Sequence, residues 1–299
     1  MQVKNPKRAL NGVLMLDKAP GASSNGALQQ AKRLYQAAKA GHAGTLDPLA
    51  TGLLPVLFGE ATKFSSDLLE ADKSYAAEIV LGVSTATADA EGEVISTRAV
   101  HVTRERLAGA LSNFSGVILQ TPPIYSALKH QGKPLYAYAR AGIEIEREPR
   151  QVTIHAIALQ WFEGERLALT VTCSKGTYIR SIAHDLGELL GCGGHLAALR
   201  RTAVGRFNLD TAHTLENLQA MPAKERDHCL LPVDALLHSL PEARLDAAEE
   251  ARFVTGQAVP WNGAPQARVR VYGAGGALLG LGETDAGGVL APKRVIANT

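Results

Sequence analysis

The spacing of apolar positions changes from segment to segment along the first half of the chain. Residues 12–16 form a short, continuous apolar run of the kind that makes a buried strand. Residues 25–39 keep one apolar face at helical spacing, with Ser23 and Ser24 as candidate caps. The same patterns predict strands over 53–58 and 75–81 and helices over about 61–70 and 104–114. Residues 41–52, rich in Gly, Pro and Thr, are expected to form a loop.

The second half of the chain begins with an alternating segment and changes character near its end. Every second residue from Leu167 to Cys173 is apolar, which predicts a half-buried strand over 166–174. A helix is expected over about 178–190, because an apolar pattern there runs up to a glycine. Further on, short β-type runs alternate with glycine-rich joints, and residues 268–282 are typical of a hairpin.

Length and composition predict a folded protein with two domains, or with one large domain. The chain has 299 residues, against a usual size of about 150 residues per domain. Its content of 46% hydrophobic and 20% charged residues is enough for a core and argues against global disorder. The acidic stretch 240–250 is the expected entrance to the smaller domain. We therefore expect a large domain over 1–238 and a small, mainly β domain over 239–299.

Cysteine spacing and the lengths of the apolar runs bear on the compartment. Cys173, Cys192 and Cys229 are too far apart for a CxxC motif and too few for a disulfide framework, which favours a reducing environment. No apolar run reaches the roughly 18 residues that span a bilayer, and the run at 13–16 is too short for a secretion signal. These features predict a cytoplasmic protein.

The net charge of +2 hides an uneven distribution of charges along the chain. Residues 1–40 carry seven Lys or Arg and a single acidic residue, whereas residues 60–93 carry two bases and eight acids. A milder basic excess lies at 171–206. Such segregation is typical of a face that binds a polyanion, although lysines that are simply solvated give the same pattern.

Motifs for metal, dinucleotide and hydrolase chemistry are absent from the sequence. The nine histidines include no HExxH pair, and Cys192-Gly-Gly-His195 lacks the second half that a zinc site needs. The glycine-rich stretch 273–282 is only a loose GxGxxG without a following helix pattern, and there is no GxSxG elbow or P-loop. We therefore expect neither a metal nor a cofactor.

The loop before the second predicted strand combines one histidine and one carboxylate. His42 and Asp47 lie in a glycine-permitted segment that enters the apolar strand 53–58. An Asp-Pro pair is most often a simple turn. A loop held against a buried strand is nevertheless a common place for a catalytic group.

Two further segments carry unassigned polar groups. Residues 173–180 lie at a predicted strand-to-helix junction, where Lys175 and Arg180 are placed to attract a phosphate or a carboxylate. The plainer interpretation makes Arg180 a surface charge and Tyr178 an ordinary amphipathic-helix residue. Tyr75 opens a predicted strand, for which a core role is the default.

Several motifs follow one another along nearly the whole chain. The longest is Gly41-His-Ala-Gly-Thr-Leu-Asp-Pro-Leu-Ala-Thr-Gly-Leu-Leu-Pro55. The others are Leu16-Asp-Lys18, Gly59-Glu-Ala-Thr-Lys-Phe64, Asp72-Lys-Ser-Tyr75, Pro123-Ile-Tyr-Ser-Ala-Leu-Lys129, Cys173-Ser-Lys-Gly-Thr-Tyr-Ile-Arg180 and Leu199-Arg-Arg201. Together they resemble the TruB family, the bacterial tRNA pseudouridine-55 synthases. One departure is that Pro20 directly precedes Gly21, where the family usually has one residue between them; Lys18 stays in place.

The resemblance implies an α+β fold and a set of site residues. The fold is a mixed, largely antiparallel sheet flanked by helices, the pseudouridine synthase fold, with a small PUA-like C-terminal domain. Asp47 is then the catalytic aspartate, Arg180 its ion-pair partner, and Tyr75 the residue that stacks on the target base and acts as general base. The implied substrate-binding residues are His42, Tyr75, Tyr178 and Leu199.

The implied reaction isomerises uridine to pseudouridine in the T-arm of tRNA. It breaks the bond from N1 to C1′ and rejoins the uracil through C5 without a redox change, so that it needs no cofactor. Asp47 would form a covalent adduct, at C1′ or at C6. The implied partner is tRNA, with no membrane and no obligate protein partner, and the protein is expected to be a monomer. Two alternatives stay open: a non-catalytic tRNA-binding chaperone, and a synthase directed to another RNA by a guide RNA.

Overall fold

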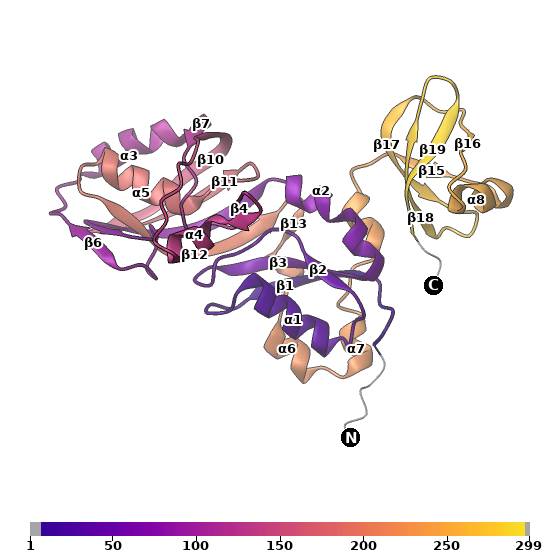
Figure 1. The fold of residues 1–299 in the computed structure, drawn as a ribbon, viewed down its shortest axis with the longest axis horizontal. Helices are drawn as coiled ribbons and strands as arrows, with labels where there is room; N and C mark the ends of the chain where they lie inside the picture. Colours follow the sequence, from indigo (N-terminus) through magenta and orange to yellow (C-terminus); the bar gives the residue numbers. More distant parts are fainter. Residues whose placement is uncertain (1–6, 297–299) are drawn as a thin grey trace.

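A ten-stranded mixed sheet forms the centre of the larger domain (Figure 1). The computed structural model describes residues 7–296, so that residues 1–6 of the basic stretch and 297–299 of the predicted second domain lie outside it. The strand order is β14-β1-β3-β12-β4-β11-β10-β7, with β2 beside β3 and β13 beside β12. Its strands are β1 (Gly12–Lys18), β2 (Ala40–His42), β3 (Thr51–Phe58), β4 (Lys73–Leu81), β7 (Gly116–Gln120), β10 (Arg150–Glu163), β11 (Arg166–Cys173), β12 (Gly194–Val204), β13 (Phe207–Asn208) and β14 (His213–Thr214).

Most neighbouring strands in this sheet run antiparallel. The parallel pairs are β1 with β14 and β3 with β12. The expected mixed, largely antiparallel sheet is therefore confirmed. Two short hairpins project from it, β5 (Val83–Thr85) with β6 (Val94–Thr97) and β8 (Lys129–His130) with β9 (Lys133–Pro134).

Helices cover the sheet in two groups (Figure 1). One group lies beside β1–β3, and α3 and α5 lie beside β10 and β12. Apolar side chains of α1 and α5 join those of β1, β3 and β4 in one core. The helices of this domain are α1 (Ser24–Leu34), η1 (Gly59–Phe64), α2 (Ser65–Glu70), α3 (Arg104–Leu111), η2 (Ser112–Phe114), α4 (Leu135–Arg140), α5 (Ile179–Leu189), η3 (Leu209–Thr211), α6 (Leu215–Ala220), α7 (Ala223–Asp227) and η4 (Val233–Leu237).

The strands β1 and β3 are buried on both faces. Leu14 and Leu54 belong to the core below α1, whereas Val13 and Leu53 pack with Phe64 of η1 in a second core. A strand covered on both sides needs apolar residues at every position. This is why both segments are continuous apolar runs in the sequence.

The first helix is shorter than the apolar pattern predicts. The predicted cap Ser23 accepts a hydrogen bond from the backbone of Gly26, but α1 ends at Leu34 rather than near residue 39. Gln36 takes a left-handed conformation with φ of 53°, which breaks the helix. Tyr35 and Ala37 are still buried, since the chain beyond the helix continues along the same core.

The C-terminal domain is a five-stranded sheet with a core of its own. The predicted hairpin is confirmed, since β17 and β18 pair antiparallel. The stretch expected only as an entrance to the domain also begins a helix, α8, because Asp246 and Glu249 form a capping box. The elements are β15 (Glu242–Arg244), α8 (Ala247–Val254), β16 (Val259–Pro260), β17 (Gln266–Tyr272), β18 (Leu278–Thr284) and β19 (Val289–Val295).

Polar contacts join the two domains. The Tyr272 hydroxyl donates to Asp234, 2.9 Å away, and Arg268 forms an ion pair with Asp67 at 2.8 Å. Leu281 of β18 also packs into the core around Phe64. Within residues 7–296, no helix is both long enough and apolar enough to cross a membrane.

Candidate active site

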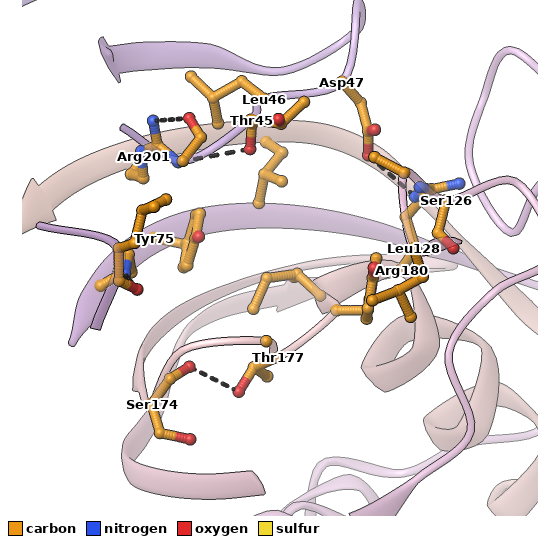
Figure 2. Close-up of a pocket in the computed structure, with 18 residues that line it drawn as sticks. Thr45, Leu46, Asp47, Tyr75, Ser126, Leu128, Ser174, Thr177, Arg180 and Arg201 are labelled. Atoms are coloured by element: carbon orange, nitrogen blue, oxygen red, sulfur yellow. Dashed lines mark hydrogen bonds and ion pairs between the residues drawn. The ribbon is translucent and has the colours of Figure 1, made fainter. Parts of the chain in front are cut away.

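A cavity of about 390 Å³ opens where the loop between β2 and β3 meets β4, β12 and the start of α5. This volume lies in the range of small-molecule sites. Five of the six site residues named from the sequence line it: Asp47, Tyr75, Tyr178, Arg180 and Leu199. Figure 2 shows the side chains of Asp47 and Arg180 meeting at one side of it. The sheet thus brings together residues that lie up to 152 positions apart in the chain.

The first residue of α1 anchors the loop that carries Asp47. Ser24, which the sequence suggests as a helix cap, is instead buried under the loop. Its hydroxyl donates to the carbonyl oxygen of Leu46 at 2.8 Å and accepts from the Leu46 amide at 2.7 Å. Lys18 donates to the carbonyl oxygen of Pro48 at 3.3 Å. Both neighbours of Asp47 in the chain are therefore tied to the body of the domain.

Arg180 joins Asp47 to a second carboxylate that the sequence reasoning missed. Its Nε lies 3.0 Å from Oδ2 of Asp47, and its Nη1 lies 3.5 Å from Oδ2 of Asp89. The guanidinium also donates to the carbonyl oxygens of Thr87 and Tyr125. Asp89 belongs to the acidic block 60–93 and looks there like a surface charge, so only the fold reveals it.

The electrostatics of Asp47 reflect two opposing effects. Burial raises the pKa of its carboxyl above the ordinary value, and the Arg180 charge opposes this rise. The charge of Asp89 raises the same pKa further. The arginine thus favours the ionised form of Asp47, the form that can act as a nucleophile.

Two tyrosines face the cavity from different elements. Tyr75 lies on β4, opposite Arg201 of β12 and Val171 of β11. Tyr178 precedes α5, where its amide donates to the side chain of Gln120 at 2.7 Å. Burial raises the pKa of both hydroxyls, so that both are protonated at neutral pH. The implied role of Tyr75 as a base therefore requires that it first lose this proton.

His42 lies outside the lining of the cavity. It ends β2, opposite Val56 of β3, so that the predicted loop begins two residues later than the glycine pattern suggests. Burial lowers the pKa of its imidazole, which keeps the ring neutral at pH 7. Its Nδ1 atom is buried, and no residue of the described range 7–296 forms a hydrogen bond with it.

Besides Arg180, three further lysine and arginine side chains are buried among the described residues, and two of them, Lys73 and Arg201, line the cavity. Lys18 donates to the carbonyl oxygens of Ala19 and Ala22, and Lys73 donates to those of three residues at the end of α2. Burial lowers the pKa of Lys73 to about 8. The third is Arg201, which is 1% exposed. Lys18 and Arg201 stand in the sequence motifs, but nothing in the sequence indicates that they are buried.

The remaining sequence candidates lie apart from the cavity or pair elsewhere. Lys175 forms an ion pair with Glu70. Cys192 is buried, and His195 bonds through Nδ1 to the carbonyl oxygen of Val83. Among residues 7–296, no group of three or more His, Cys, Asp or Glu side chains is arranged to hold a metal ion.

The chain matches family descriptions over nearly its whole length. Residues 32–179 match the N-terminal domain of the TruB family pseudouridylate synthases. Residues 180–238 match the tRNA pseudouridylate synthase B C-terminal domain, and residues 241–296 match the description "Pseudouridine synthase II TruB, C-terminal".

Individual proteins agree with these matches. The chain is 56% identical to tRNA pseudouridine synthase B of Azoarcus sp., covering 99% of this chain and 98% of that protein. It is 54% identical to the protein of that name from Aromatoleum aromaticum, covering 99% and 96%. Its fold is similar to a chain of an archaeal box H/ACA sRNP Nop10-Cbf5 complex, with a TM-score of 0.72, 25% identity and coverage of 96% and 86%. A cavity built around an Asp47–Arg180 pair, together with these similarities over the full chain, shows that the protein belongs to the TruB family of pseudouridylate synthases.

Proposed function

We propose that the protein converts uridine to pseudouridine at position 55, in the T-arm of tRNA. The observation that carries this proposal is the ion pair of Asp47 with Arg180 in a cavity large enough for one nucleoside. The relatives with about 55% identity are tRNA pseudouridine synthases, which supports tRNA as the substrate. Position 55 and the T-arm come from the resemblance of the motifs.

In this proposal Asp47 is the nucleophile. Its side chain is 37% exposed toward the cavity, and the buried guanidinium of Arg180 holds one of its oxygens. An adduct at C1′ or at C6 of the uracil divides the isomerisation into two easier steps. The target nucleotide must first leave its stack, at a cost of a few kcal/mol. Tyr178 and Leu199 then line the pocket for the flipped base, and His42 supports the flipped conformation from the neighbouring strand.

Tyr75 has two roles in this proposal. Its ring stacks on the target base, and its hydroxyl removes the proton from C5 after the uracil has turned. A neutral phenol cannot accept that proton, so the step needs a phenolate. The buried guanidinium of Arg201, on the strand beside β4, is a group that can favour this form.

Phosphate contacts would offset the cost of base flipping and make tRNA binding dependent on salt. Part of the basic stretch 1–40 serves the fold instead, since Arg8 pairs with Asp227 and Lys18 is buried. Arg33 and Lys39 are exposed and are the better candidates for RNA contacts. We assign the catalytic part to residues 1–238 and a tRNA-docking part to residues 239–299, in a cytoplasmic monomer.

The two alternative functions have less support. A tRNA chaperone would need a basic face but not an aspartate, an arginine and a tyrosine around one cavity. A guide-RNA-directed synthase would fit the fold of the Nop10-Cbf5 complex, but that chain is 25% identical to this one, against 56% for a tRNA synthase.

Mass-spectrometric mapping of pseudouridine tests this proposal. An unmodified tRNA transcript is incubated with the purified protein, and a transcript with cytidine at position 55 is the control. Pseudouridine at position 55 alone is the expected result. Modification at other positions would overturn the T-arm assignment. If the tRNA were bound tightly and left unmodified, the chaperone alternative would replace the proposal.

A further inference from the structure

Arg201 is the largest side chain that the described part of the protein buries completely, with 1% of its surface exposed. It lies at the point where β12 runs between β3 and β4, opposite Gly52 on one side and Tyr75 on the other. A Cβ atom at Gly52 would lie 2.2 Å from the carbonyl oxygen of Arg201, and Gly52 has a φ of +97°. Only glycine allows β3 to approach β12 here.

The guanidinium of Arg201 binds the chain on both sides of Asp47. Its Nε donates to the carbonyl oxygen of Leu53 at 2.7 Å. Its Nη2 donates to the carbonyl oxygen of Gly44 at 3.1 Å. Figure 2 shows Arg201 joined by dashed lines to the segment beside Thr45. A longer contact of 3.5 Å joins Nη1 to the carbonyl oxygen of Thr45. Gly44 and Thr45 precede Asp47 by three and two residues, and Leu53 follows it by six, so this side chain helps to fix the position of the carboxylate.

The charge of Arg201 is not neutralised by a carboxylate. Arg180 pairs with Asp47 and Asp89, whereas no carboxylate within residues 7–296 forms an ion pair with Arg201. Carbonyl oxygens solvate a guanidinium without cancelling its charge. Burial lowers the pKa of Arg201, but an arginine starts high enough to remain protonated in a protein. The cavity therefore has a full positive charge in its wall.

Tyr75 is the strand neighbour on which the charge of Arg201 acts. Arg201 and Tyr75 are paired across neighbouring antiparallel strands, so that their side chains project from the same face of the sheet. We infer that Arg201 is a positioning residue for the reaction proposed above: it holds the Asp47 loop and stabilises the deprotonated form of Tyr75. The catalytic part of this inference rests on the proposed function. The coupling between Arg201 and Tyr75 can be tested whether or not that function is correct.

The titration of Tyr75 is consistent with this role. Burial raises the pKa of its hydroxyl, and the charge of Arg201, with hydrogen bonding to it, opposes the rise. The other groups that act on Tyr75 are Cys173 on β11 and Asp47 in the loop, and both raise its pKa. Arg201 is thus the group that lowers the pKa of Tyr75 in a pocket that otherwise raises it.

The test compares Arg201→Met, which removes the charge, with Arg201→Lys, which keeps it without the planar geometry of the guanidinium. The control is Arg200→Met, because Arg200 pairs with Asp17 and its side chain is 42% exposed. Tyrosines are labelled with ¹³C at Cζ, the protein is titrated by NMR, and the spectrum of Tyr75→Phe identifies the Tyr75 signal. Turnover is measured on an unmodified T-arm stem-loop.

We expect Arg201→Met to move the Tyr75 titration to higher pH and Arg201→Lys to move it less, while Arg200→Met leaves it unchanged. Turnover in Arg201→Met should fall by about 100-fold with KM nearly unchanged, since misplacement by about 1 Å has effects of that size. The same substitution should cost less in a Tyr75→Phe background, because the part of its effect that depends on the tyrosine hydroxyl is already lost there.

An unchanged Tyr75 titration in Arg201→Met would overturn the inference, as would an equal loss of turnover with and without the tyrosine hydroxyl. If Arg201→Met does not fold, the titration of Tyr75 in Arg201→Lys decides between the outcomes. The lysine ammonium cannot occupy the position of the guanidinium, so an unshifted Tyr75 signal in this variant would contradict the coupling. A wild-type protein that forms no pseudouridine would refute the proposed function, and the titration would still decide whether Arg201 acts on Tyr75.

Discussion

Arg180 and Asp47 form an ion pair in which the arginine is 5% exposed and the carboxylate is 37% exposed. The Nε atom lies 3.0 Å from Oδ2 of Asp47, and backbone carbonyl oxygens of Thr87 and Tyr125 hold the rest of the guanidinium. The arginine is thus fixed, and the carboxylate is oriented while part of it stays open to the cavity. This asymmetry suits a nucleophile that must reach a substrate.

Asp47→Asn should abolish turnover. The amide has nearly the shape of the carboxylate but cannot form the covalent adduct, so we expect a loss of more than about 1000-fold in single-turnover rate on a T-arm stem-loop. Affinity for the stem-loop should stay within a few-fold. Substantial residual pseudouridine formation by this variant would show that Asp47 is not the nucleophile.

Arg180→Lys should distinguish the contribution of the positive charge from that of the guanidinium geometry in the Arg180–Asp47 ion pair. A lysine keeps the positive charge, but one ammonium cannot reproduce the contacts of a planar guanidinium with Asp47 and Asp89. Turnover should fall much more than RNA affinity does. Arg180→Ala should in addition destabilise the fold by about 3–5 kcal/mol, because it leaves the buried carboxylate of Asp89 without its counter-charge. A defect confined to RNA binding would instead assign Arg180 to a phosphate.

Asp89→Asn should shift the acid side of the pH profile. Asp47 acts as an anion, and its raised pKa means that activity is lost as the pH falls through a value above the ordinary one for aspartate. The Asp89 charge contributes to that rise, so its removal should move the acid limb of kcat/KM to lower pH. Asp210→Asn, at an exposed position outside the cavity lining, is the control. A limb that does not move would exclude electrostatic coupling of Asp89 to Asp47.

Two neighbouring serines offer a matched pair of variants. Ser23→Ala removes the N-cap of α1 and should cost about 1 kcal/mol of unfolding free energy while turnover is preserved. Ser24→Ala removes both buried hydrogen bonds to Leu46 and should cost about 1–3 kcal/mol. Because Leu46 adjoins Asp47, only the second variant should also slow turnover. Denaturant unfolding and single-turnover assays on both proteins measure these effects, and equal turnover would show that the loop does not depend on Ser24.

Local patterns in the sequence determined many of the elements. The continuous apolar runs of β1 and β3 follow from burial on both faces, and the alternation before Cys173 follows from a strand with one buried face. The end of α1 could not be predicted, because Tyr35 and Ala38 continue the helical spacing of apolar residues, whereas Gln36 breaks the helix. Tyr35 and Ala37 remain buried after α1 has ended at Leu34. An apolar pattern indicates which residues are buried, and here the buried segment of the chain extends beyond the end of the helix.

Some residues of the candidate site could likewise be predicted from the sequence, and others could not. The sequence by itself, through its motifs, indicated Asp47, Tyr75 and Arg180, because their chemical types and their order along the chain can be recognised without a fold. Only the tertiary structure showed the contact of Asp89 with Arg180 and the burial of Arg201 beside Tyr75. The physical reason is that the charge state and the role of an ionisable group depend on its solvation and on its neighbours in space, and both arise only when distant strands come together.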